Sequence, residues 1–201
     1  MSTFDERASD WDTPQRRDRA KALAAVIRAS VPLWPAMRAI DIGAGTGLVG
    51  IELARDVGEM VLAEPSEGML AVAREKLASG AWPTVTAVAF DLAADVPPGP
   101  PFDLAVSLLV LHHVADTAAA LRAIHGLLAP GGRIALLDLD AEDGSFHDAD
   151  AVGIHHHGFE RAAIIRKAEA AGFIDLQART ATEIERDGRA YPLFLLTGRK
   201  P

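Results

Sequence analysis

The chain has 201 residues, 49% of them hydrophobic and 24% charged, which is the composition of an ordinary globular protein. Its formal net charge is −8 and no basic run extends beyond residues 15–17 and their neighbours, which disfavours a nucleic-acid partner. The absence of cysteine excludes disulfides, thiolate metal ligands and a thiol nucleophile. Residues 1–10 lack the apolar segment of a signal peptide, and no apolar stretch approaches the roughly 18 residues of a membrane span. We therefore expect a cytoplasmic protein with no membrane partner.

Short apolar runs alternate with helical patterns along the chain, as they do in repeated βα units. The pattern predicts helices at residues 19–30, 48–56, 67–77, 117–128 and 159–171. It predicts strands at residues 37–42, 60–63, 84–90, 102–109 and 133–139. Two further strand candidates, 173–180 and 191–197, are joined through 185–188 and could pair as an antiparallel hairpin at the sheet edge. The order of these elements predicts a doubly wound α/β fold.

A glycine-rich turn, Asp41-Ile42-Gly43-Ala44-Gly45-Thr46-Gly47, lies between the first predicted strand and the following helix. Glycines there let the backbone turn tightly and approach a ligand closely. The dinucleotide pattern G-x-G-x-x-G would require glycine where Leu48 stands, and the phosphate loop would require lysine at the same position. The turn therefore suits a ligand whose adenosine carries no phosphate, and the alternative is a tight turn with no ligand.

Acidic residues follow at the ends of the next two predicted strands. Glu64 can accept both hydroxyl protons of a ribose, or it is simply an exposed residue before a turn. Asp91 can accept from an adenine amino group while the N–H of Leu92 donates to a ring nitrogen, although aspartate is also common in turns. Met69 and Leu70 could pack on the adenine or on the core of the protein.

Several segments in order carry a resemblance to a known family: AIDIGAGTG, EPSEGML, FDL, FDLAVSLLVLHHVAD and LLAPGGRIALLDL. This set resembles the class I S-adenosylmethionine-dependent methyltransferases, and with the opening FDERASDWD it is similar to their compact small-molecule branch. The resemblance implies a seven-stranded sheet, mostly parallel with an antiparallel last strand, and helices on both faces. It also implies a single domain over residues 1–201. Its parts are a helical lid segment at 1–30, a cofactor-binding core at 37–140, and a substrate-side loop, helix and hairpin at 141–201.

The resemblance further implies the cofactor S-adenosylmethionine, with S-adenosylhomocysteine as product. The glycine turn would surround the methionine part, and the end of the fourth strand would face the sulfonium. The implied cofactor-binding residues are Asp41, Gly43, Ala44, Gly45, Gly47, Glu64, Pro65, Met69, Asp91, Leu92, Ser107, Leu108 and Leu109.

His112 and His113, just past the fourth strand, are the candidates for a catalytic base. Methyl transfer from a sulfonium is an in-line displacement, so a base is needed only if the acceptor must lose a proton. Histidine can accept that proton near neutral pH, but packing is the alternative role, and the sequence does not separate the two residues.

Two further segments are candidates for contacts with the substrate. Phe4 and Trp11 lie at helical spacing in the opening segment, which closes over the cofactor in relatives or else docks on the core. His155, His156 and His157 follow the fifth strand and could contact substrate from a loop. Three consecutive side chains cannot all point to one place, so we predict no metal site from this run, and a histidine/carboxylate site with the nearby His147, Asp148 and Asp150 is the alternative.

We therefore expect a methyltransferase that modifies an O, N or C atom of a small molecule, as a monomer or a homodimer. One alternative is a regulatory protein that binds S-adenosylmethionine without turnover. Another is a nicotinamide-dependent oxidoreductase, which the spacing of the glycines disfavours.

Overall fold

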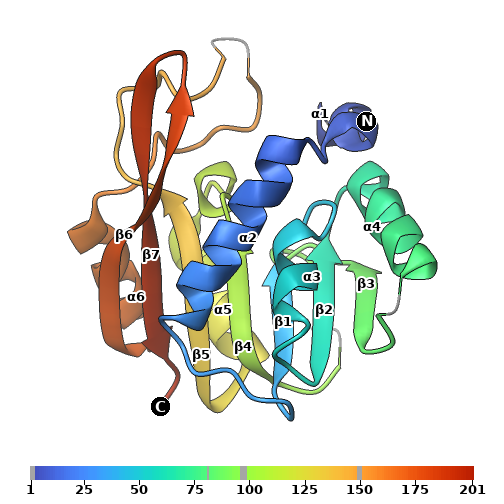
Figure 1. Ribbon diagram of the computed structural model, residues 1–201. Coiled ribbons are helices and arrows are strands. Elements are labelled where there is room, and N and C mark those ends of the chain that lie inside the picture. Colours follow the sequence, from blue (N-terminus) through green and yellow to red (C-terminus); the bar gives the residue numbers. More distant parts are fainter. Residues whose placement is uncertain (1–2, 81, 96–98, 149–150) are drawn as a thin grey trace.

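The computed structural model describes residues 3–80, 82–95, 99–148 and 151–201, and its centre is one seven-stranded sheet (Figure 1). The strand order is β3-β2-β1-β4-β5-β7-β6. The first five strands of this order are parallel, and β7 is antiparallel to both of its neighbours. The strands are β1 (Arg38–Ile42), β2 (Glu59–Glu64), β3 (Val85–Ala89), β4 (Phe102–Leu108), β5 (Leu128–Leu139), β6 (Ile174–Arg186) and β7 (Arg189–Arg199).

Helices cover both faces of the sheet, with α2 and α3 in front of it and α5 behind it in Figure 1. The helices are α1 (Thr3–Arg7), α2 (Pro14–Arg28), α3 (Leu48–Leu53), α4 (Glu67–Ser79), α5 (Thr117–Leu127) and α6 (Arg161–Ala170), with 3-10 turns η1 (Ala8–Asp10) and η2 (Leu111–His113). This architecture confirms the predicted doubly wound α/β fold, including the antiparallel last strand.

The sheet separates two apolar cores, and alternation along each strand assigns its side chains to them. In β2, Met60 and Leu62 pack with α2, α3 and α4, whereas Val61 and Ala63 pack on the side of α5 and α6. Because both faces are buried, the inner strands read as continuous apolar runs in the sequence. Their carboxyl ends meet at one edge, which carries the glycine turn, Glu64 and the loops after β3, β4 and β5.

Several predicted boundaries were wrong where capping or pairing decides them. The first predicted helix starts at Pro14 and not at residue 19, because Thr13 caps it by accepting the N–H of Arg16. The fifth strand starts at Leu128, which pairs with Phe102, so the turn predicted at 129–132 lies within that strand.

The C-terminal hairpin is confirmed but is longer than predicted. Only Asp187 and Gly188 connect β6 to β7, both with positive φ, as a two-residue Asp-Gly turn requires. The hairpin therefore extends past the end of β5. There Ile184, Tyr191 and Leu193 form a small third core with Phe146 from the loop after β5.

That loop, residues 140–158, is held at its base by a close backbone approach. Gly158 has φ +70, and a β-carbon there would lie 2.1 Å from the carbonyl oxygen of Asp140. The N–H of Phe159 donates to Leu139 (2.9 Å), and that of Ala141 donates to Phe159 (3.1 Å). The loop thus leaves and returns at the carboxyl end of β5.

We expect Gly158→Ala to destabilise the protein more than Gly188→Ala does. Both residues have positive φ, which is unfavourable for alanine by about 1–2 kcal/mol. A β-carbon at Gly188 would face open space, whereas a β-carbon at Gly158 would also clash with the backbone of Asp140. Urea denaturation measures the free energy of unfolding of both variants. Equal losses of this free energy would contradict the close approach of Gly158 to Asp140.

Candidate functional site

The glycine turn is a sharp left-handed bend at the carboxyl end of β1. Gly43, Gly45 and Gly47 have φ of +65°, +56° and +82°. The N–H of Gly43 donates to the carbonyl of Ala63 (2.8 Å), which fixes the turn against the end of β2. A β-carbon at Gly43 would lie 2.5 Å from Val110, so glycine is required there for the loop after β4 to approach.

Asp41 is a buried carboxylate, 2% exposed, beneath this turn. Its Oδ2 accepts the N–H of Gly50 in α3 (2.9 Å). Burial raises the pKa of Asp41 to about 7, and the charge of Glu64 acts in the same direction, while the hydrogen bond from Gly50 opposes the shift.

Glu64 links the glycine turn to the start of α4. Its two oxygens accept the N–H of Gly45 (2.7 Å) and the N–H of Ser66 (2.8 Å). Burial raises the pKa of Glu64, the two hydrogen bonds lower it, and the charge of Asp5 raises it again. Two desolvated carboxylates therefore lie side by side and would be stabilised by a ligand that brings hydrogen-bond donors or positive charge.

The opening segment lies over this turn. The ring of Trp11 packs edge-on against Phe4, with centroids 6.0 Å apart, and its indole nitrogen is the atom nearest to a β-carbon built on Gly45, at 4.0 Å. The ring of Phe4 in turn meets His113, with centroids 5.3 Å apart. The structure thus brings Trp11 to the glycine turn and places Phe4 between Trp11 and His113.

Two aspartates hold the opening segment in place. Asp5 accepts from the hydroxyl of Ser66 (2.6 Å) at the start of α4. Asp12 accepts from the hydroxyl of Thr46 (2.5 Å) in the glycine turn and from the ammonium of Lys76 (2.8 Å). Sequence reasoning missed both residues, because their partners are more than 30 positions away along the chain.

Asp91 follows β3 at the same edge of the sheet, and in this structure it forms a turn. Its carboxylate accepts the N–H of Ala93 (2.9 Å), and its own N–H donates to Asp95 (2.7 Å). Asp91 is exposed, and Leu92 is half-buried against the core. The turn is the alternative foreseen from the sequence, and an adenine contact by this pair stays a prediction.

The remaining residues of the predicted cofactor set differ in exposure. Met69 and Leu70 are fully buried, which favours the core interpretation. Ala44 is half-buried and Pro65 exposed.

The end of β4 carries two irregular features. Ser107 is buried, and its hydroxyl has no hydrogen-bond partner within the described ranges. Leu109 has φ +56, an unusual conformation for leucine, and it packs with Leu108 against the third core. The chain is thus redirected over the site as β4 ends.

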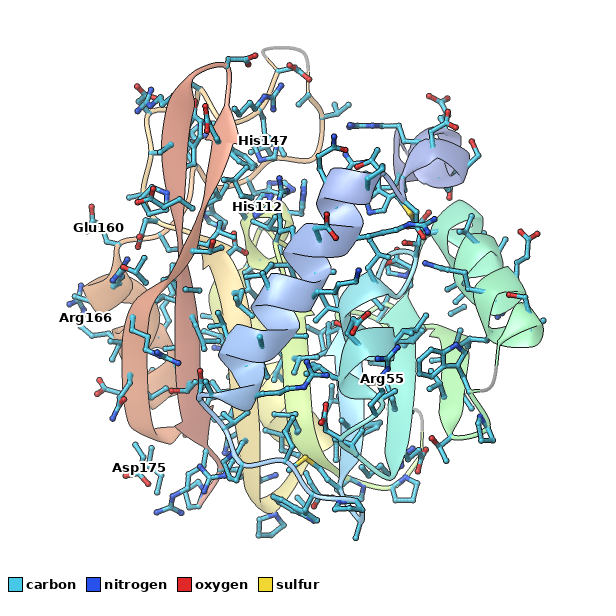
Figure 2. All side chains as sticks on the ribbon, viewed as in Figure 1. Arg55, His112, His147, Glu160, Arg166 and Asp175 are labelled. Carbon is cyan, nitrogen blue, oxygen red and sulfur yellow. The ribbon has the colours of Figure 1, made fainter. Side chains whose placement is uncertain are left out.

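Beyond this bend, His112 is buried and bonded to a carboxylate of β5. Its Nδ1 lies 2.6 Å from Oδ1 of Asp138, and its backbone N–H donates to Oδ2 (3.2 Å). His147, from the loop after β5, stacks near it with ring centroids 5.1 Å apart, and Figure 2 labels both imidazoles at this end of the sheet. Sequence reasoning did not assign a role to Asp138, whose signal was an acid inside an apolar strand.

The three consecutive histidines do not gather their rings at one point. The N–H groups of His155 and His156 donate to the carbonyl of His112 (3.0 and 3.1 Å). The ring of His156 bonds to the carbonyl of Val114 (3.0 Å), and the side chain of His157 is 60% exposed. The run supports the loop that carries His112 through its backbone. Among the described residues, no group of three or more His, Asp or Glu is arranged to hold a metal ion.

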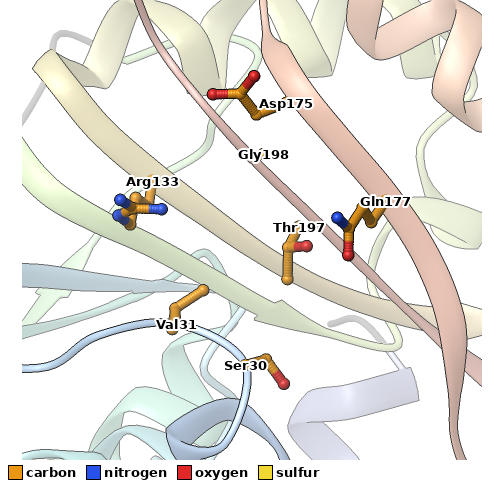
Figure 3. Close-up of a pocket in the computed structure, with 7 residues that line it drawn as sticks. All are labelled: Ser30, Val31, Arg133, Asp175, Gln177, Thr197 and Gly198. Atoms are coloured by element: carbon orange, nitrogen blue, oxygen red, sulfur yellow. The ribbon is translucent and has the colours of Figure 1, made fainter.

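A separate hollow of about 200 Å³ lies at the opposite edge of the sheet (Figure 3). Ser30 and Val31 follow α2, Arg133 lies near the start of the parallel run of β5, and Thr197 near the end of β7. The glycine turn is at the other end of these strands, so this hollow is not part of the candidate site.

Comparison with known proteins places this architecture among methyltransferases. Residues 40–134 match a family described as a methyltransferase domain. The ubiquinone biosynthesis O-methyltransferase of Ruegeria pomeroyi is 39% identical over 97 residues, 48% of this chain and 38% of that protein. The ubiquinone/menaquinone biosynthesis C-methyltransferase of Shewanella oneidensis is 35% identical over 108 residues, 52% of this chain and 43% of that protein. The matches therefore span about two fifths of the length of these relatives.

Solved structures share the fold at low identity. A Haloferax volcanii protein described as a methyltransferase, solved with the Trm112 methyltransferase activator, has a TM-score of 0.83 and 18% identity, covering 100% of this chain and 99% of its own. Phosphoethanolamine N-methyltransferase 2 of Haemonchus contortus, solved with phosphomonomethylethanolamine and S-adenosylhomocysteine, has a TM-score of 0.75 and 18% identity over 89% of this chain and 52% of its own.

The sheet order and the glycine turn at its carboxyl edge define a Rossmann-like α/β protein. The match over residues 40–134 and the relatives make the chain similar to methyltransferases, in agreement with the sequence resemblance, and the solved structures share its fold. Within the described ranges, no helix is both long and apolar enough to cross a membrane.

We expect Asp41→Asn to remove a loss of stability that the wild type shows as pH rises from about 4 to about 7. Unfolding returns the pKa of Asp41 from about 7 to an ordinary carboxyl value of about 3.9, so the folded state holds the extra proton between these values. Stability therefore falls as pH rises through this window, whereas asparagine still accepts from Gly50 without ionising. Thermal unfolding at about pH 5 and about pH 8 measures the difference. The exposed Glu75→Gln serves as control, and parallel curves for wild type and Asp41→Asn would contradict the prediction.

Proposed function

We propose that the chain binds S-adenosylmethionine at the glycine turn and transfers its methyl group to a small organic acceptor. The observation that carries this proposal is the pair of desolvated carboxylates, Asp41 and Glu64, beneath a turn covered by Trp11. A ligand with ribose hydroxyls and an α-ammonium group supplies the donors and the positive charge that this pair favours. The bound cofactor would supply an electrophilic methyl carbon.

In this proposal, the residues of the chain bind and orient the ligand. Glu64 would accept from the ribose hydroxyls, and Asp41 would hold the glycine turn and face the methionine part of the ligand. Trp11 and Phe4 would cover the site and exclude water, and an aromatic face beside a sulfonium is favourable. The names of the curated relatives, which concern quinone biosynthesis, support a small acceptor and include both O- and C-methylation.

The proposal is tested by calorimetry with S-adenosylhomocysteine and with NAD. We expect binding of S-adenosylhomocysteine alone, and we expect Gly45→Arg to abolish it by filling the space between the turn and Trp11. Gly188→Arg is the matched control, because Gly188 also has positive φ (+76°) and no atom lies within 4 Å of its β-carbon. Binding of NAD without S-adenosylhomocysteine would favour the oxidoreductase alternative, and unchanged affinity in Gly45→Arg would refute the placement of the site.

We expect the affinity for S-adenosylhomocysteine to increase from about pH 6 to about pH 8. Burial raises the pKa of both Asp41 and Glu64, and the donors of the ligand favour their deprotonated forms, so binding should release protons. Glu64→Gln should weaken binding by roughly 10- to 100-fold, the effect of a hydrogen bond to a charged group. Calorimetry in buffers of different ionisation enthalpy counts the protons released. An affinity that does not vary with pH would argue against contact with these carboxylates.

A further inference from the structure

The site contains a buried histidine whose ring orientation is fixed by a carboxylate. His112 is 1% exposed and Asp138 0% exposed. Asp138 Oδ1 lies 2.6 Å from Nδ1 of His112 and also accepts the N–H of Leu139 (2.8 Å). Because a carboxylate only accepts, Nδ1 is the donor, and Nε2 of the neutral ring carries the free lone pair.

That lone pair has no partner among the described residues. Nε2 of His112 is buried, and within the described ranges no hydrogen-bond donor reaches it. Buried polar atoms in folded proteins are nearly always hydrogen-bonded, so an unpaired one requires an explanation. A donor on a bound molecule, such as a hydroxyl group, would provide the missing partner.

The pair also lies close to the glycine turn and to the opening segment. Val110, two residues before His112, meets the glycine turn at Gly43, and the ring of His113 contacts Phe4 of the opening segment. The pair is therefore next to the turn and beneath the segment that covers it.

The other two imidazoles of the cluster are less suited to take up a proton. Nδ1 of His113 donates to the carbonyl of Gly153 (2.9 Å), and burial and the charge of His112 lower the pKa of His113. Burial and the charges of His112 and His113 lower the pKa of His147 to about 4. Both rings thus remain neutral near pH 7, and only His112 has a carboxylate at Nδ1 to stabilise an imidazolium.

The rings around the pair indicate a flat acceptor. His113, His147, Phe4 and Phe146 are in edge-to-face or tilted contact with one another around His112. Aromatic rings pack favourably against one another edge-to-face or offset, so a flat aromatic ring suits a place among them. A neutral amine attacks with its own lone pair, whereas a hydroxyl gains most from a base, so the pair favours a phenolic hydroxyl.

We propose that His112, held by Asp138, is the general base that deprotonates an aromatic hydroxyl of the methyl acceptor. This inference rests on the proposed function. His112 Nε2 takes the hydroxyl proton, and the electron pair of the O–H bond stays on the oxygen. The oxygen forms a bond to the methyl carbon of the sulfonium donor, and the C–S electron pair stays on sulfur, leaving a thioether and a methyl ether. Asp138 acts as a positioning residue that stabilises the imidazolium.

Nuclear magnetic resonance of the protein with ¹⁵N-labelled histidine tests the inference without turnover. With S-adenosylhomocysteine bound, we expect His112 in the Nδ1–H form and a shift of its Nε2 resonance when catechol is added. His125, which also has an unpartnered Nε2 but lies on α5 against Phe173, is the internal control and should not respond. Asp138→Asn should change the tautomer of His112, since asparagine can donate to Nδ1.

Transfer of labelled methyl from S-adenosylmethionine to catechol provides the second measurement. We expect His112→Asn to lower kcat by about 10²- to 10⁴-fold, the usual contribution of a general base, with unchanged affinity for S-adenosylhomocysteine. In the wild type, kcat should fall at acid pH, with Asp138, His113 and His147 as the titratable groups that face His112.

The outcomes separate the inference from the function on which it rests. Failure to bind S-adenosylhomocysteine would overturn both. If S-adenosylhomocysteine binds but catechol leaves the His112 resonances unmoved, the inference alone is overturned. The same holds if His112→Asn forms the methyl ether at the wild-type rate, or if the methyl group is found on carbon. Because the resonance measurement uses the native protein, misfolding of a variant does not prevent a decision.

Discussion

The interaction on which the site depends is the pair of hydrogen bonds from backbone N–H groups to the carboxylate of Glu64. One comes from Gly45 in the glycine turn (2.7 Å) and the other from Ser66 at the start of α4 (2.8 Å). A single side chain at the end of β2 thereby fixes the turn after β1 relative to the helix after β2. Parallel strands make this possible, because their carboxyl ends meet at one edge. The position of the opening segment follows from it, since Asp5 bonds to the same Ser66.

The acidity of this edge links the structure to its chemistry. Burying Asp41 and Glu64 together is unfavourable for their charged forms, and backbone N–H groups relieve that only in part. A cationic, hydroxyl-bearing ligand would relieve the rest, and ligand binding and fold stability would then depend on the same groups. The negative net charge seen in the composition is therefore not only a matter of solubility, because part of it lies at the candidate site.

The order of elements and the site edge could be predicted because they depend on local patterns. Apolar runs, the glycine turn and acids at strand ends are visible in the sequence, and the fold places them together as predicted. Boundaries set by distant partners could not be predicted in this way: β5 begins where Leu128 pairs with Phe102. The same limit applies to His112 and His113, which are adjacent in sequence. Their difference arises from Asp138 on another strand and from the bend at Leu109, and neither is a property of the local pattern.

The opening segment and the loop after β5 are far apart in the sequence, yet they meet around the same histidines. Phe4 packs on His113, while His147 packs on His112 and His113. Any displacement of the opening segment would expose both the glycine turn under Trp11 and the imidazoles beside Phe4. One short segment therefore contacts both the glycine turn, through Trp11, and the histidine cluster, through Phe4.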